Sequence, residues 1–86
     1  MDEKIELLKT KARENHVPIL QDVSMEVIET ILEIKKPKNI LELGTAVGYS
    51  AICFSNHLAE GGHIDTVELS EETANVAKKN IIEFGV

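Results

Sequence analysis

The chain has 86 residues, of which 43% are hydrophobic and only 3% aromatic, and its 15 acidic and 9 basic residues give a formal net charge of -6. This length suits one small domain or a part of a larger one, with an aliphatic core, and the negative charge excludes a nucleic-acid or anionic-membrane surface on this segment. The single cysteine excludes an internal disulfide, and no apolar run is long enough for a signal peptide or a membrane span, so we expect a cytoplasmic protein.

The first part of the chain predicts two helices. Apolar residues recur at helical spacing among many charges over residues 2–14, which indicates an amphipathic helix. Pro18 interrupts the helical pattern, because proline disfavours helical geometry in the residue before it. A second helix is expected over residues 24–35, with Asp22 or Ser24 capping its start and Pro37 ending it.

The remaining residues predict two strands that alternate with two helices. We expect strands at residues 39–43 and 64–69, and helices at residues 48–58 and 71–84, with Gly85 as a C-terminal cap. Two strands joined through a helix must be parallel. Two parallel strands alone leave both edges unpaired, so we expect a truncated α/β domain or one that another chain completes, most simply as a homodimer.

The turn between the first strand and its helix is the most informative segment. Gly44 and Gly48 flank it, and a missing side chain there lets the backbone approach a ligand near a helix start with free amide groups. The dinucleotide pattern G-x-G-x-x-G would require glycine also at Ala46 and Tyr49, so two of its three positions fail. By itself the turn fits a ligand site and a merely structural turn equally well.

Two carboxylates accompany this turn. Glu68 stands at the predicted carboxyl end of the second strand, where open α/β sheets bind ligands and where a carboxylate can accept both hydroxyls of a ribose. Its alternative interpretation is an exposed acid at a strand end. Glu42 lies in an otherwise apolar strand, where an acid is costly to bury without hydrogen-bond partners, so it either contacts a ligand or caps the following loop.

Residues 42–50, ELGTAVGYS, resemble motif I of the S-adenosylmethionine-dependent O-methyltransferases related to catechol and caffeoyl-CoA O-methyltransferases. Residues 66–69, TVEL, resemble their second motif, and the VPIL run before the second helix also fits. The similarity extends from about Ala12 to Val86. It implies the N-terminal part of a Rossmann-like class I methyltransferase domain, with leading helices at residues 1–36 and a cofactor-binding β-α-β-α unit at residues 39–86.

The resemblance implies S-adenosylmethionine as the cofactor and assigns a role to each matching position. Glu68 would hold the ribose hydroxyls, Glu42 would help fix the methionine amino group, and Ser50 with the backbone near Leu20 would bind the methionine carboxylate. The residues of the turn would pass beneath the methionine part or pack beside it: Gly44, Thr45, Ala46, Gly48 and Tyr49.

The resemblance also implies what this segment lacks. The divalent-metal ligands and the catalytic lysine of the family would follow later in the complete protein, so no catalytic or metal-binding residue is assigned here and the isolated chain is predicted to be inactive. The implied reaction transfers a methyl group to a hydroxyl of a small molecule or of a tRNA hydroxyuridine, with the metal bringing that hydroxyl toward its anionic form.

Two other interpretations stay open at this point. One is an NAD-type nucleotide enzyme, which the failed glycine pattern disfavours, and the other is a non-catalytic fragment that binds cofactor weakly or only oligomerises. The remaining reactive side chains favour neither, since His16, His57 and His63 lack the spacing of metal ligands and Cys53 is flanked by apolar residues that indicate a core position.

Overall fold

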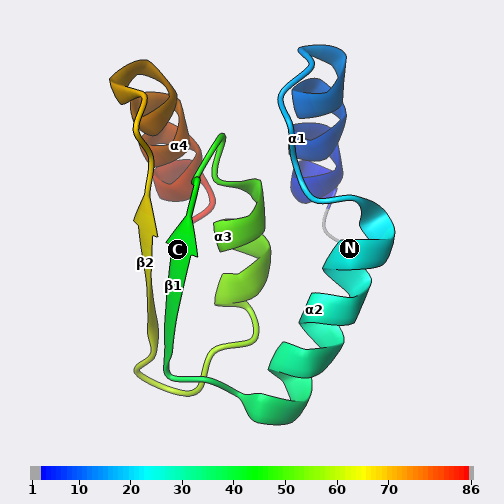
Figure 1. Ribbon diagram of the computed structural model, residues 1–86, viewed down its shortest axis with the longest axis vertical. Helices are drawn as coiled ribbons and strands as arrows, with labels where there is room; N and C mark the ends of the chain where they lie inside the picture. The colour runs from blue at the N-terminus through cyan, green and yellow to red at the C-terminus, as the bar shows by residue number, and fades with distance from the viewer. Residues whose placement is uncertain (1–2, 86) are drawn as a thin grey trace.

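The computed structural model describes residues 3–85, and every element predicted from the sequence is present in the predicted order (Figure 1). The elements are α1 (Glu3–Glu14), α2 (Asp22–Lys35), β1 (Asn39–Leu43), α3 (Tyr49–Ser55), β2 (His63–Val67) and α4 (Glu71–Glu83). The predicted α/β class is therefore confirmed.

The two strands pair in parallel, as their connection through α3 requires. The register runs from Asn39 opposite His63 to Leu43 opposite Val67. The ladder continues beyond β1, since the Gly44 amide donates to the Val67 carbonyl oxygen at 2.7 Å. The carboxyl ends of both strands thus lie side by side, at the top of Figure 1, and the loops that follow them share one edge of the sheet.

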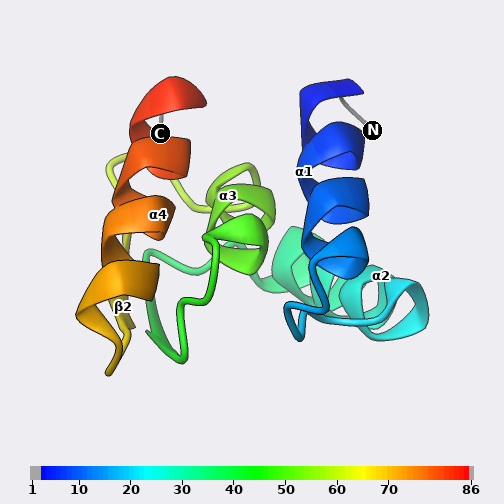
Figure 2. The ribbon, with the colours of Figure 1, turned by 90° about the horizontal axis from the view of Figure 1, so that it is seen from above.

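The sheet has one covered and one bare face. Helices α3 and α4 lie on the same side of the strands, and α1 and α2 lie beyond α3 (Figure 2). Ile40 and Ile64 pack against the core on that side. The alternate residues face away and stay exposed, Leu41 by 69%, Leu43 by 79% and Val67 by 49%. Because parallel sheets are normally covered on both faces, the described residues form only part of a complete α/β architecture.

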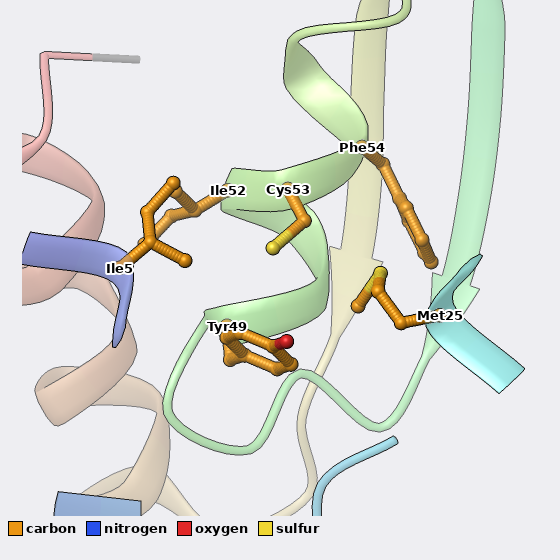
Figure 3. Packing of buried hydrophobic residues seen from close by; sticks show 6 residues of the cluster. All are labelled: Ile5, Met25, Tyr49, Ile52, Cys53 and Phe54. Carbon is orange, nitrogen blue, oxygen red and sulfur yellow. The ribbon is translucent and has the colours of Figure 1, made fainter. Parts of the chain in front are cut away.

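The core is centred on α3. Its side chains meet α1 through Ile5 and α2 through Met25 (Figure 3). Five of the seven residues of α3 are buried, and a helix that is apolar all round is stable only when other elements surround it. Ile52 is 2% exposed, and burial of such a side chain contributes about 1.5 to 3 kcal/mol.

The start of α2 differs from the prediction. The helix begins at Asp22, its N-cap is Gln21, and no side chain caps it, so the predicted capping by Asp22 or Ser24 is wrong. The Asp22 carboxylate instead accepts hydrogen bonds from Arg13 at 2.9 Å and from Lys9 at 3.3 Å. These hydrogen bonds, that from Arg13 foremost, lower the pKa of Asp22. The carboxylate therefore ties α1 to α2.

The boundaries of three later elements also need correction. Helix α3 is shorter than predicted and ends at Ser55, whose hydroxyl donates to the Ile52 carbonyl oxygen at 2.6 Å. Such local bonds compete with helix continuation. Strand β2 begins one residue early, at His63, and ends at Val67. Helix α4 begins where predicted and ends one residue early, at Glu83. Ser70 accepts from the Thr73 amide at 3.3 Å, and Gly85 has a left-handed conformation behind the last turn.

Candidate functional site

A cleft opens where the chain leaves β1, with a volume of about 400 Å³. Four segments surround it: the extended connection before α2, α2 itself, the end of β1 with its turn, and α3. The lining residues are Pro18, Ile19, Leu20, Ile28, Glu42, Leu43, Gly44, Thr45, Ala46, Tyr49, Ser50 and Phe54. Seven of the nine residues assigned from the sequence are among them, and the two exceptions are Gly48 and Glu68.

Backbone conformation explains the composition of the turn. Gly44 has φ +88°, and a Cβ added there would meet nothing within 4 Å, so the turn needs its φ while the space beside it stays open. Ala46 also has a positive φ, 49°. For a residue with a side chain this left-handed geometry costs about 1 kcal/mol, and surrounding contacts must hold it.

Gly48 allows α4 to pack closely against the turn and does not line the cleft. Its φ is +90°, and a Cβ there would lie 3.4 Å from Cγ1 of Ile81 and 3.5 Å from the Ala77 carbonyl oxygen. Helix α4 is also fixed nearby, since the Asn80 side chain donates to the Val47 carbonyl oxygen at 2.8 Å. Gly48 therefore shapes the turn and admits α4, and the structure does not bring it into the cleft lining.

Glu68 holds the turn from the neighbouring strand. One of its oxygens accepts the Ala46 amide at 2.9 Å and the other accepts the Ser70 amide at 3.1 Å. These backbone hydrogen bonds, that from Ala46 foremost, lower the pKa of Glu68. The side chain is thus more than an exposed strand-end acid. Each carboxylate oxygen has further lone pairs, so Glu68 can still accept hydroxyl groups from a ligand that passes Ala46.

Two hydroxyl groups donate hydrogen bonds to the Glu42 carboxylate, which offsets the free-energy cost of burying an acid in an otherwise apolar strand. Ser50 donates to its Oε2, and Thr66 donates to its Oε1 at 2.8 Å. The Thr66 oxygen also lies 2.6 Å from the hydroxyl oxygen of Thr45, a side chain only 5% exposed. Thr66 received no role from the sequence, although the parallel register places it directly opposite Glu42 and an alignment of the two strands could have indicated it.

The same network constrains Ser50. A hydroxyl carries one proton, and that of Ser50 goes to Glu42. To bind a methionine carboxylate through its side chain, Ser50 would have to release Glu42, so its predicted role requires a rearrangement or the main chain.

Tyr49 belongs to the core and to the cleft wall at once. Its side chain is 1% exposed and lies in the cluster around α3 (Figure 3). Its hydroxyl oxygen is buried without a hydrogen-bond partner of good geometry. Burial raises the pKa of Tyr49 to about 12 and, in the same cluster, the pKa of the Cys53 thiol to about 11. Both groups stay protonated at neutral pH, which favours the core position predicted for Cys53.

A larger open cleft of about 680 Å³ lies between α1, α2 and α3. Three of its four acidic side chains already have partners, since Asp22 pairs with Lys9 and two glutamates flank His57, Glu29 at 2.7 Å and Glu33 at 2.8 Å. Across residues 3–85 no group of three or more His, Cys, Asp or Glu side chains is arranged to hold a metal ion. The smaller cleft at the strand ends is therefore the better candidate for a site.

Comparisons with known proteins address the same segment. A family model described as O-methyltransferase matches residues 2–86. The protein-L-isoaspartate O-methyltransferase of Methanosarcina mazei is 46% identical over 55 residues, which are 64% of this chain and 23% of that protein. The catechol O-methyltransferase of Niastella koreensis is 39% identical over 59 residues, which are 69% of this chain and 27% of that protein.

A solved structure gives the same result for the fold. The O-methyltransferase from Bacillus cereus in complex with SAH matches with a TM-score of 0.83 and 29% identity, covering 98% of this chain and 39% of that chain. The chain therefore spans about a quarter of the length of the two curated relatives, 23% and 27%, and 39% of this solved structure. Between residues 3 and 85, no helix has the length and apolar character needed to cross a membrane.

Proposed function

We propose, because this chain belongs to the O-methyltransferase family, that the cleft at the strand ends binds S-adenosylmethionine and that the complete protein transfers its methyl group to a hydroxyl. The resemblance expected from the sequence is confirmed, as is the Rossmann-like class I fold, of which this chain forms the N-terminal part. The observation that carries the proposal is the pair of fixed carboxylates, Glu42 and Glu68, on either side of the Ala46 turn.

The cleft suits this cofactor in chemistry as well as in place. Small-molecule sites combine apolar walls with a few fixed polar groups. Here the apolar walls come from Ile19, Leu20, Ile28 and Phe54, with Glu42 as the acid in the lining. The open space beside Gly44 leaves the backbone accessible to a ligand. A ligand with an ammonium group at one end and ribose hydroxyls further along matches these acceptors.

The roles of this chain are binding and orientation. Glu68 accepts the ribose hydroxyls while its existing bonds to the Ala46 and Ser70 amides keep it in place. Glu42 accepts the ammonium group, held by Ser50 and Thr66. When bound, the cofactor supplies an electrophilic methyl group on its sulfonium sulfur. The protein groups then fix the direction in which that methyl points, which is the positional part of catalysis.

The acceptor is proposed at a coarser level. The names of the two curated relatives indicate different acceptors, an isoaspartate for one and a catechol for the other. We favour a hydroxylated small molecule, with a tRNA hydroxyuridine as the further option, and we assign any divalent metal and the acceptor pocket to residues outside this chain. The isolated chain should accordingly bind cofactor without turnover. A cytoplasmic location and pairing with a second chain remain proposals from the sequence.

Calorimetric titration with S-adenosylhomocysteine, with NAD as the competing ligand class, tests the proposal. We expect binding of S-adenosylhomocysteine and none of NAD. Glu68→Gln keeps an oxygen for the Ala46 amide but removes the charge, and should weaken binding by about tenfold or more, since hydrogen bonds to a charged group contribute about 1.5 to 3 kcal/mol.

Asp65→Asn is the matched control for this variant. It removes the same charge from β2 at a side chain that is 73% exposed and whose alternate position points it to the bare face. Its affinity should equal that of the original chain. Binding of NAD in preference to S-adenosylhomocysteine, or equal losses in both variants, would refute the proposed site.

A further inference from the structure

We propose that Thr66 is a positioning residue of the cofactor site. Together with Thr45, it holds the Glu42 carboxylate in the orientation that receives the ammonium group of the ligand. This inference rests on the proposed function and extends it to a β2 side chain that does not line the cleft.

Each threonine hydroxyl has one proton to donate, and this fixes the direction of each hydrogen bond in the network. An ionised carboxylate only accepts, so the single hydroxyl proton of Thr66 goes to Glu42 Oε1, 2.8 Å away. Thr66 can then only accept at its other contact, and Thr45 must donate across the 2.6 Å between the two hydroxyl oxygens. Thr45 is 5% exposed, so bulk water has little access to replace either partner. The chain of bonds therefore runs from Thr45 through Thr66 to Glu42.

The second oxygen of Glu42 is held from another element. Ser50, in the first turn of α3, donates to Oε2, while Thr66 reaches Oε1 from β2. With both oxygens held, the carboxylate cannot turn without losing a bond. Each oxygen keeps a further lone pair, and Glu42 is one of the residues that line the cleft. An acceptor fixed before binding avoids the ordering cost that a loose side chain would add.

A merely structural role for Thr66 predicts a different outcome. Thr66→Val keeps the branched shape but removes the hydroxyl, which leaves Thr45 without its acceptor and frees Oε1 of Glu42. If Thr66 only packs the strand, the loss should affect all ligands of the cleft alike. If it positions Glu42, only ligands with the ammonium group should bind more weakly.

Two ligands separate these outcomes: S-adenosylhomocysteine, which has the amino-acid end, and 5′-methylthioadenosine, which keeps the ribose and lacks that end. Thr66→Val should weaken S-adenosylhomocysteine by about tenfold, as expected for one hydrogen bond to a charged group, and leave 5′-methylthioadenosine within about twofold. Thr66→Ser should restore the affinity. Thr30→Val is the matched control, because it removes a hydroxyl that donates to the Glu26 carbonyl oxygen of its own helix.

The failures of the two proposals can be told apart. If the original chain binds neither ligand, the proposed function fails and the inference fails with it. If it binds both, and Thr66→Val weakens both equally or neither, the cofactor site stands and the positioning role of Thr66 is overturned. Far-ultraviolet circular dichroism of Thr66→Val and Thr66→Ser checks that both variants keep the fold.

Discussion

The two faces of the sheet use the same strands for different purposes. On the covered face, Ile40 and Ile64 pack against the core, and Glu42 and Thr66 follow them on the same side of their strands. Each strand therefore contributes both core residues and residues of the candidate site. On the bare face the strands present exposed Leu41 and Leu43, with no helix over them among the described elements. The difference indicates that the proposed cofactor site can be organised on one face while the other face still lacks the contacts that a parallel sheet requires.

The sharpest test of this comparison removes a large side chain from each face. Ile52→Ala on the covered side should destabilise the fold by about 2 to 5 kcal/mol, because it leaves a cavity in the core around α3. Leu41→Ala, on a side chain that is 69% exposed, should change stability by only about 0.5 kcal/mol or less.

Urea unfolding of the two variants measures the difference. An 86-residue chain has a small free energy of unfolding, which Ile52→Ala could exceed. Ile52→Val is therefore measured as well, and it should lower the free energy of unfolding by about 0.5 to 1.5 kcal/mol. Equal costs for Ile52→Ala and Leu41→Ala would mean that the bare face is buried in solution, by self-association for example, and the comparison would fail.

A second test concerns the pH dependence of the covered side. The hydrogen bonds from His57 to Glu33 and Glu29 of α2 raise the pKa of His57 above its ordinary value of 6.5. A raised native pKa stabilises the fold fully below the unfolded value of 6.5, and this contribution is lost as the pH rises through the native pKa.

Thermal unfolding between pH 6 and pH 9 should therefore show a falling Tm that His57→Gln flattens. His63→Gln is the control, because the His63 side chain is 62% exposed at the start of β2 and lies 3.4 Å from the carboxylate of Asp65, on its own strand. A slope that persists in His57→Gln would show that the imidazole does not link α2 to α3.

The smallest expected effect lies on the bare face itself. Leu43→Lys places a charge where the side chain is 79% exposed, so the stability of the monomer should change by about 0.5 kcal/mol or less. If the bare face mediates pairing of two chains, the same substitution should abolish it. Sedimentation velocity over a range of concentrations measures this, and a chain that is monomeric at all concentrations before substitution would remove the bare face as a pairing surface.

Sequence patterns predicted the order and pairing of the elements better than the contacts between their side chains. The order of elements and the parallel pairing followed from periodicity and from the turn at Gly44. The capping of α2 was mispredicted because Asp22 pairs with Arg13, a partner nine positions earlier that no local rule weighs. The role of Thr66 was missed for a similar reason, since its bond to Glu42 depends on strand register and not on spacing along the chain.

The measurement that tests the central claim most directly is a titration of the 15N-labelled chain with S-adenosylhomocysteine, followed by amide chemical shifts. We predict that the shifts concentrate at Gly44 and Ala46 in the turn, at Ser50 in α3 and at Glu68 beyond β2, while Leu41 and Asp65 on the bare face stay unchanged. Shifts confined to the larger cleft between α1, α2 and α3, or no shifts at saturating ligand, would contradict a cofactor site at the strand ends.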